Sequence, residues 1–430
     1  MPGDAPLAAI DTLPLTQAQL GVLQGQQMCG DDSVFYAAEC VYLDGPLDTA
    51  AFGRALQATL LDAPSLHLRL VERAGELRQQ LLPPQVPALV VRDIDEADLD
   101  AEIARELAQR FDPHSGHLLS HRLYRLAPQR HCWLHRAHHL LLDGYGFQMI
   151  ARRVAAHYGA ALGGAAAADT GFSGLAAVVD ADLAYQASAD RTADRAFWLQ
   201  RLAGLQPMSL CAKPAAGIGR GRRHRGQLPK AVCSSLKARA AEFSLSWPEL
   251  LIAAFAGFVA AHGHGRDVVL GLPVMQRLGS PAARTPCTAM NVMPLPVAQA
   301  GALSLPALSL ATRESLRGLR ARQRYRFEHL EGDLEHAGHA RGLLATEINV
   351  MPFEHPGHYG QASASTRILA GGPVEDLAAI FVARGDAIGF DLDGRPQNYG
   401  AEELSRHWQN FVAFLQRWLD RPAANAADLR

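Results

Sequence analysis

The sequence has no paired cysteines, no long apolar runs and no marked excess of either charge. Its six cysteines occur singly, without a Cys-x-x-Cys pair, which argues against a disulfide framework or a cysteine zinc site. No apolar segment approaches membrane-spanning length. The first ten residues lack a basic start and carry Asp4, unlike a signal peptide. With a net charge of -2 as well, we expect reduced thiols, a cytoplasmic location and no nucleic-acid or membrane partner.

The chain is long enough for two hydrophobic cores. It has 430 residues, of which 48% are hydrophobic and 20% charged, as in an ordinary globular protein. A segment at 161–171 is rich in Ala and Gly and is the strongest linker signal. We therefore expect an N-terminal domain at 1–172 and a C-terminal domain at 173–430.

The most informative segment spans 131–146 and holds two adjacent histidines followed by an Asp-Gly pair. Residues 131–134 predict a buried strand, and apolar residues at helical spacing begin at Phe147. Gly144 and Gly146 are expected to allow a tight backbone between the strand and the helix. The pattern places an imidazole where a strand ends and a loop opens, which is a common setting for chemistry.

The residue types in this loop suit proton transfer. His138 and His139 should point to opposite faces of the strand, so one can act while hydrogen bonds hold the other. A neutral imidazole accepts a proton near pH 7 more readily than any other unperturbed side chain. Asp143 could orient a histidine or pair with a buried arginine. The absence of a side chain at Gly144 leaves room for a substrate.

Two other interpretations of the histidines stay open. Histidines on an apolar strand are often core residues whose hydrogen bonds are satisfied. A metal site is the second interpretation, since His135, His138, His139 and Asp143 are plausible ligands. Their spacing differs from the helical His-Glu-x-x-His motif and no cysteine pair supports them, so we expect no metal.

The pattern His-His-x-x-x-Asp-Gly at 138–144 resembles the signature of condensation domains of nonribosomal peptide synthetases, which belong to the chloramphenicol-acetyltransferase-like acyltransferases. Further segments similar to that family follow in its order: Leu-Thr-x-Ala-Gln at 15–19, Gly-Pro-Leu-Asp at 45–48, Gly-Leu-Pro-Val at 271–274, and Asn-x-x-Pro at 291–294 and 349–352. The resemblance implies an α/β fold of two chloramphenicol-acetyltransferase-like lobes in a V-shaped pseudo-dimer. It also implies segments of the C-terminal lobe that cross back to the N-terminal lobe.

The resemblance also implies roles for the loop residues. His139 would be the catalytic histidine, as general base, as electrostatic stabiliser of the intermediate or as a positioning group. His138 and Asp143 would hold the loop, and Gly144 would keep a tunnel open for the substrate arm.

Three residues outside the histidine pair complete the expected site. By resemblance, Arg277 ends a strand and is the structural partner of Asp143. Asn349 would line the cavity, although a capping or turn role is the alternative for this residue. Tyr145 is expected to contact the substrate.

The implied reaction is acyl transfer from the phosphopantetheine thioester of an acyl or peptidyl carrier protein to an amine or a hydroxyl group. The acceptor would be bound to a second carrier protein or would be a soluble amine or alcohol. We expect a monomer that binds no cofactor of its own. Two alternatives are an acyl-coenzyme A-dependent acyltransferase of the same fold and a non-catalytic docking member.

Some segments depart from the usual family pattern. Gly21 and the segment 323–328 resemble the subtype that starts an assembly line or builds siderophores, as does 371–377. This subtype suggests an aryl or fatty acyl donor. A start at Met1 and the absence of adenylation or carrier regions favour a free-standing enzyme over an excised domain.

Two further segments predict local structure. The basic run at 220–225 is expected to be a solvated loop, with a carrier-protein contact as its functional alternative. The proline-stopped segments at 291–294 and 349–352 are expected to be edge or crossing strands.

Overall fold

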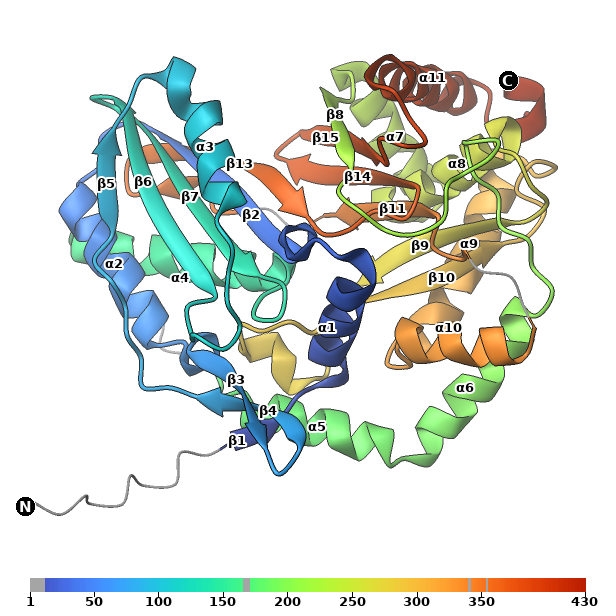
Figure 1. The fold of residues 1–430 in the computed structure, drawn as a ribbon. Helices are drawn as coiled ribbons and strands as arrows, with labels where there is room; N and C mark the ends of the chain where they lie inside the picture. The colour runs from blue at the N-terminus through green and yellow to red at the C-terminus, as the bar shows by residue number, and fades with distance from the viewer. Residues whose placement is uncertain (1–11, 165–170, 339–341, 353–354) are drawn as a thin grey trace, which may run out of the picture. The chain divides into compact units, whose positions relative to one another are not determined.

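The computed structural model describes residues 12–164, 171–338, 342–352 and 355–430 (Figure 1). Contacts divide the chain into two compact units. Unit 1 comprises the described residues of Met1–Ala187, Met275–Ala289 and His355–Gly372, and unit 2 comprises those of Ser188–Val274, Met290–Glu354 and Pro373–Arg430. Unit 1 thus continues past residue 172 and takes in two later segments. Most of the expected linker and the first ten residues lie outside the described part of the chain.

Unit 1 combines a six-stranded sheet with a smaller three-stranded one. Its helices are α1 (Gln17–Cys29), α2 (Thr49–Leu61), α3 (Leu99–Ala108), α4 (Gly144–Ala161) and α5 (Ala176–Gln186). Its strands are β1 (Thr12–Pro14), β2 (Tyr36–Asp44), β3 (Leu68–Arg73), β4 (Glu76–Leu81), β5 (Val90–Asp93), β6 (Leu119–Ala127), β7 (Arg130–His138), β12 (His358–Tyr359) and β13 (Ala362–Gly371). The six-stranded sheet has the order β12-β13-β2-β7-β6-β5, and the smaller sheet has the order β1-β4-β3.

The central strand β7 is buried on both faces. Trp133 packs with Phe52 of α2 and Phe147 of α4 on one face. Leu134 packs with Ile103 of α3 on the other, as alternation along a strand requires. The late strand β13 pairs with β2 in this same sheet, and the two run side by side in Figure 1. A strand more than two hundred residues away in sequence therefore helps to build the surroundings of β7.

Unit 2 is a second α/β unit around one six-stranded sheet. Its helices are α6 (Ala189–Leu202), α7 (Lys230–Glu242), α8 (Trp247–His262), α9 (Leu305–Ala321), α10 (Phe327–His336) and α11 (Ala401–Asp420). Its strands are β8 (Arg222–Gln227), β9 (Val268–Val274), β10 (Asn291–Val297), β11 (Thr346–Met351), β14 (Leu377–Arg384) and β15 (Ala387–Gly394), in the sheet order β10-β9-β11-β14-β15-β8. The nearly all-apolar α8 is buried in this unit and begins with a capping box between Ser246 and Glu249.

Two sequence-based expectations about strands need correction. The basic run is not a solvated loop, because 222–227 forms β8 and pairs with β15. Arg223 contacts Asp393 at 2.5 Å, so carboxylates of the neighbouring strand stabilise the positive charge. Strand β10 is an edge strand as predicted, but β11 lies inside the sheet between β9 and β14, with its proline just beyond the strand.

Among the described residues, no single helix is both long and apolar enough to cross a membrane. Helices α7 and α8 together pass the same test of length and composition, but they meet at a bend of 107°. Since α8 is part of the core of unit 2, burial inside the protein accounts for its apolar sequence.

Candidate active site

The histidine loop joins β7 to α4 within unit 1. His138 is the last residue of β7, and the backbone N–H of His139 donates to the carbonyl oxygen of Phe35 at 2.8 Å. Asp143 is the N-cap of α4, where its side chain accepts a hydrogen bond from the N–H of Gly146. The loop is therefore fixed by a backbone hydrogen bond at its β7 end and by the Asp143 side chain at its α4 end.

His138 is fully buried and has partners for both ring nitrogens. Its Nδ1 accepts a hydrogen bond from the N–H of Leu140 at 3.0 Å, so the neutral ring carries its proton on Nε2. His138 Nε2 lies 2.9 Å from Nε2 of the Gln26 side-chain amide. Turning this amide over by 180° exchanges its nitrogen and oxygen and gives the protonated Nε2 an acceptor. Burial, assisted by the nearby His139, lowers the pKa of His138 to about 3. These contacts indicate a neutral histidine that holds the loop.

His139 is held differently and keeps 7% of its surface exposed, whereas His138 has none. Its Nδ1 lies 3.1 Å from the carbonyl oxygen of Leu142. A carbonyl can only accept, so Nδ1 carries a proton and the neutral ring has its lone pair on Nε2. The carbonyl oxygen of His139 itself accepts a hydrogen bond from the hydroxyl of Thr288.

The Nε2 side of His139 faces the end of β13. A methyl group added to Gly372 would lie 3.5 Å from Nε2, so this stretch of backbone is close to the ring. Burial lowers the pKa of His139, and it outweighs Asp143 and backbone hydrogen bonds to Leu142 and Gly371, which act in the opposite direction. The ring is thereby kept in its neutral, proton-accepting form.

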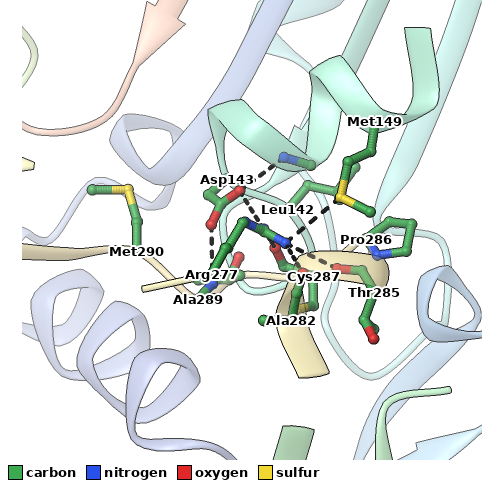
Figure 2. A network of polar contacts seen from close by, with 12 residues as sticks. Leu142, Asp143, Met149, Arg277, Ala282, Thr285, Pro286, Cys287, Ala289 and Met290 are labelled. Atoms are coloured by element: carbon green, nitrogen blue, oxygen red, sulfur yellow. Dashed lines mark hydrogen bonds and ion pairs between the residues drawn. The ribbon is translucent and has the colours of Figure 1, made fainter. Parts of the chain in front are cut away.

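Asp143 and Arg277 form a buried ion pair, as Figure 2 shows. The distance from Arg277 Nη2 to Asp143 Oδ1 is 2.7 Å, and the side chains are 3% and 2% exposed. The second carboxylate oxygen of Asp143 accepts a hydrogen bond from the N–H of Ala289 at 3.0 Å (Figure 2). Asp143 thus joins the histidine loop to the 275–289 segment of the same unit.

Arg277 is almost fully used by backbone acceptors. Besides Asp143, its guanidinium donates to the carbonyl oxygens of Ala282, Thr285 and Cys287 at 2.5–3.0 Å. Burial lowers the pKa of Arg277, but the neighbouring Asp143 outweighs it, so the pKa stays above its usual value. A charged arginine with these partners has a structural role, as the sequence predicted.

The two glycines of the loop act through space rather than through unusual backbone angles. Neither Gly144 nor Gly146 is among the glycines with a positive φ, so the tight turn after β7 does not depend on a left-handed backbone at these two residues. A methyl group at Gly146 would lie 2.5 Å from Leu142 Cδ2. At Gly144 it would meet no atom within 4 Å, so the space beside this residue is open.

We predict that alanine lowers the stability at Gly146 but not at Gly144. Gly146→Ala should lower the free energy of unfolding by about 1–3 kcal/mol, because the new methyl group overpacks the loop against Leu142. Gly144→Ala should keep wild-type stability, since alanine is favoured over glycine in a helix by roughly 1 kcal/mol. Urea unfolding of both variants measures the difference. Equal stabilities would contradict this account of the loop.

The remaining predicted site residues have different surroundings. The ring of Tyr145 lies under the guanidinium of Arg277, with 5.0 Å between the Arg277 Cζ and the ring centroid. Asn349 belongs to unit 2 and lies inside β11, opposite Ile380 of β14. This position excludes the alternative of a capping or turn asparagine.

Several contacts of the loop were not predicted from the sequence. Thr288, Ala289 and Gln26 contact the loop from distant segments of the chain. Gly372 also lies beside the ring of His139, and its segment, 371–377, is the one that the sequence had already indicated. Within the described chain, no group of three or more His, Cys, Asp or Glu residues could hold a metal ion.

Comparison with known proteins identifies the family. Residues 9–430 match the family described as Condensation domain. The chain is 33% identical to a dimodular nonribosomal peptide synthase of Bacillus subtilis (strain 168) over 410 residues, which is 94% of the chain but 17% of that protein. It is 32% identical to an isonitrile lipopeptide synthase of Streptomyces coeruleorubidus, covering 98% of the chain and 29% of the relative. The chain therefore spans less than a third of either relative.

Solved structures show the same fold. The first condensation domain of the calcium-dependent antibiotic synthetase, in complex with a substrate analogue, has a TM-score of 0.89 at 27% identity and covers 98% of this chain and 99% of its own. A variant of the starter condensation domain of rhizomide synthetase RzmA, in complex with C8-CoA and Leu-SNAC, has a TM-score of 0.87 at 27% identity, with 96% of both chains covered. These matches confirm the predicted α/β fold class. The chain belongs to the condensation-domain family of nonribosomal peptide synthetases, whose members form amide bonds from carrier-bound substrates.

Proposed function

We propose that this chain transfers an acyl group from the phosphopantetheine thioester of a carrier protein to an amine. The amine nitrogen attacks the thioester carbonyl, the C–N bond forms and the C–S bond breaks. The amine loses one proton and the thiol leaves with one, so an amide and a free phosphopantetheine thiol result. The observation that carries the proposal is the geometry of His139, whose Nδ1 lies 3.1 Å from the carbonyl oxygen of Leu142, an arrangement that favours a proton on Nδ1 and leaves Nε2 to act as the base.

His139 is assigned as the general base for the attacking amine. A positioned base contributes roughly 10²–10⁴-fold to the rate, and alignment of two bound reactants removes several kcal/mol more of the barrier. Because the thioester is already activated, no covalent acyl-enzyme is needed. His139 could alternatively stabilise the charged tetrahedral intermediate or only position the amine.

The other residues support this group. His138, Asp143 and Arg277 hold the loop through the buried contacts described above. The open space beside Gly144 is proposed to admit the phosphopantetheine arm. We keep Tyr145 and Asn349 as proposed substrate contacts.

The proposed partners follow from the family. Condensation domains act on substrates tethered to carrier proteins. For this chain we propose an acyl or peptidyl carrier protein as donor and a second carrier or a soluble amine or alcohol as acceptor. We further propose that it binds no cofactor of its own, is monomeric and acts in the cytoplasm. We also keep the domain boundary at 172/173 as a proposal for the two lobes.

We predict that the rate of condensation does not fall until the pH is below 6.5, the ordinary pKa of a histidine, because burial lowers the pKa of His139 from that value. The base works only when unprotonated, so activity falls as the pH drops through this lowered pKa. A profile of kcat/KM against pH, with an acceptor amine of low basicity, measures the midpoint. A midpoint clearly above 6.5 would contradict the assignment.

An acyl-coenzyme A donor is the second candidate, since the similar starter domain of rhizomide synthetase was solved with C8-CoA. The test offers acyl groups on candidate carriers, on coenzyme A and on N-acetylcysteamine, together with a panel of amines, and detects products by mass spectrometry. Faster turnover from the carrier supports the proposal. Equal or faster turnover from coenzyme A would favour the alternative, and no product from any donor would favour a non-catalytic docking role.

A further inference from the structure

The end of β13 brings a stretch of backbone to the ring of His139. A methyl group added to Gly372 would lie 3.5 Å from His139 Nε2 and 3.9 Å from its Cδ2, so the peptide between Gly371 and Gly372 runs along this edge of the ring. The ring is hydrogen-bonded to the backbone of Gly371 as well as to that of Leu142. Because Nδ1 faces the carbonyl oxygen of Leu142 at 3.1 Å, the nitrogen that faces Gly371 is Nε2. A backbone partner that favours the charged ring is an acceptor, so the group at Nε2 is the Gly371 carbonyl.

The register of the sheet brings Gly371 to this position. Gly371 lies opposite Ala37 of β2, and Ala37 lies opposite Ala137 of β7, two residues before His139. The ladder between β13 and β2 shifts by one residue just before Ala370. In an unbroken ladder Ala370 would face Ala37, so the bulge places Gly371 in this row instead. Bulges of this kind are common next to active sites, where they change the direction of a strand.

The backbone of Gly372 fixes the direction of this peptide. Its φ is +111°, a conformation that residues with a side chain rarely adopt. The next residue is Pro373, whose ring further restricts the residue before it. Position 372 therefore requires glycine, and the Gly371 carbonyl keeps one orientation relative to the ring of His139.

The two carbonyls beside the ring serve different protonation states. A neutral imidazole has one N–H and can donate to only one of them, whereas an imidazolium ion has two and can donate to both. In the neutral ring the proton lies on Nδ1 toward Leu142, and the Gly371 carbonyl faces the lone pair of Nε2. Once Nε2 has accepted a proton, its acceptor is already in place. The Gly371 carbonyl thus stabilises only the charged ring, which is the form that a general base passes through.

The charged groups near the ring leave this task to the carbonyl. Asp143 also favours the charged form of His139, but its carboxylate is engaged by Arg277 at 2.7 Å and by the N–H of Ala289 at 3.0 Å. His138 is neutral, because burial lowers its pKa to about 3. The ring is 7% exposed, so little water surrounds it and a fixed carbonyl dipole has a larger effect than in solvent.

We propose that Gly371 is a positioning residue for acyl transfer, whose carbonyl receives a hydrogen bond from His139 Nε2 once this nitrogen has taken the proton of the amine. The inference rests on the proposed function and deepens it. Nε2 takes one proton from the amine as the C–N bond forms. The imidazolium ion is then held by the carbonyls of Leu142 and Gly371. The same proton passes from Nε2 to the thiolate sulfur as the C–S bond breaks, so the ring returns to its neutral form.

The first test is Gly372→Ala, assayed with one carrier-bound donor and one amine. Alanine is strained at a φ of +111°, so the peptide must turn and move the Gly371 carbonyl away from Nε2. We expect kcat to fall about tenfold with KM unchanged, because a hydrogen bond to the charged ring is lost. The acid limb of the profile of kcat/KM against pH should also move to lower pH, since this contact raises the pKa of His139. An acid limb that stays in place would overturn the proposal, whether or not kcat falls.

Gly75→Ala is the matched control. Gly75 lies in the turn between β3 and β4 of the same unit, has a φ of +80°, and an added methyl group there meets no atom within 4 Å. Alanine strains this backbone as well, but away from His139, so the pH profile should stay that of the wild type. A shift of the same size in Gly75→Ala would overturn the proposal, because backbone strain alone would then explain it.

A second variant covers the case in which Gly372→Ala does not fold. Glycolic acid in place of Gly372 turns the amide after Gly371 into an ester, whose carbonyl is a weaker acceptor, without adding a side chain. The acid limb should again move to lower pH. A profile equal to that of the wild type would overturn the proposal.

A titration without turnover separates this proposal from the proposed function. Nitrogen-15 NMR follows the protonation of the His139 ring in the wild type and in the variant at position 372. A lower midpoint in the variant supports the contact with Gly371 even when no donor gives product. Equal midpoints would overturn the proposal while leaving the acyl transfer itself intact.

Discussion

Asp143→Ala should lower the free energy of unfolding by about 3–5 kcal/mol, because it leaves the buried charge of Arg277 without its carboxylate. The variant also removes the N-cap of α4 and the acceptor for the N–H of Ala289. The effect should therefore lie in stability, and activity should fall as folded protein is lost. Denaturant unfolding followed by circular dichroism measures the change.

A double-mutant cycle provides the control for this pair. Arg277→Ala alone should destabilise by a similar amount, since it leaves Asp143 buried without its cation. The double variant should lose clearly less than the sum of the two single losses, because neither charge is then stranded. An Asp143→Ala variant within about 1 kcal/mol of the wild type would contradict a structural role for the pair.

His139→Ala should reduce condensation turnover by about 10²–10⁴-fold while leaving a folded protein. The hydrogen bonds of its ring go to backbone carbonyls, those of Leu142 and Gly371, so its removal unpairs no buried charge. The expected loss is therefore in kcat rather than in stability, the reverse of Asp143→Ala. Product formation with a carrier-bound donor, together with a melting curve, measures both quantities.

The control for His139→Ala is His138→Ala. This variant removes two buried hydrogen bonds, to Leu140 and Gln26, so we expect mainly a loss of stability. A soluble His139→Ala protein with wild-type turnover would remove the catalytic assignment.

Local signals predicted much of the framework of both units. The N-cap at Thr16 with its capping box to Gln19, and the box that opens α8, are encoded within four residues. Strands β14 and β15 are neighbours in the sequence and pair antiparallel across a short turn. The Arg277–Asp143 ion pair was expected from the resemblance and is present.

Features that depend on distant segments could not be predicted in this way. The basic run forms β8 because β15 supplies carboxylates, and nothing near 222–227 in the sequence indicates that partner. The position of β11 inside its sheet depends on β9 and β14, which flank it. Glu39 of β2 and His135 of β7 lie directly opposite each other, although nearly a hundred residues separate them in the sequence.

Nitrogen-15 NMR of the His139 ring tests the central assignment most directly, because the nitrogen shifts distinguish the two neutral tautomers from the imidazolium ion. At pH 7 we expect a neutral ring with its proton on Nδ1, bound to the carbonyl of Leu142, and a lone pair on Nε2. Assignment of the signals rests on their absence in His139→Ala. A ring protonated on Nε2 at this pH, or a fully charged ring, would contradict the assignment of His139 as the base.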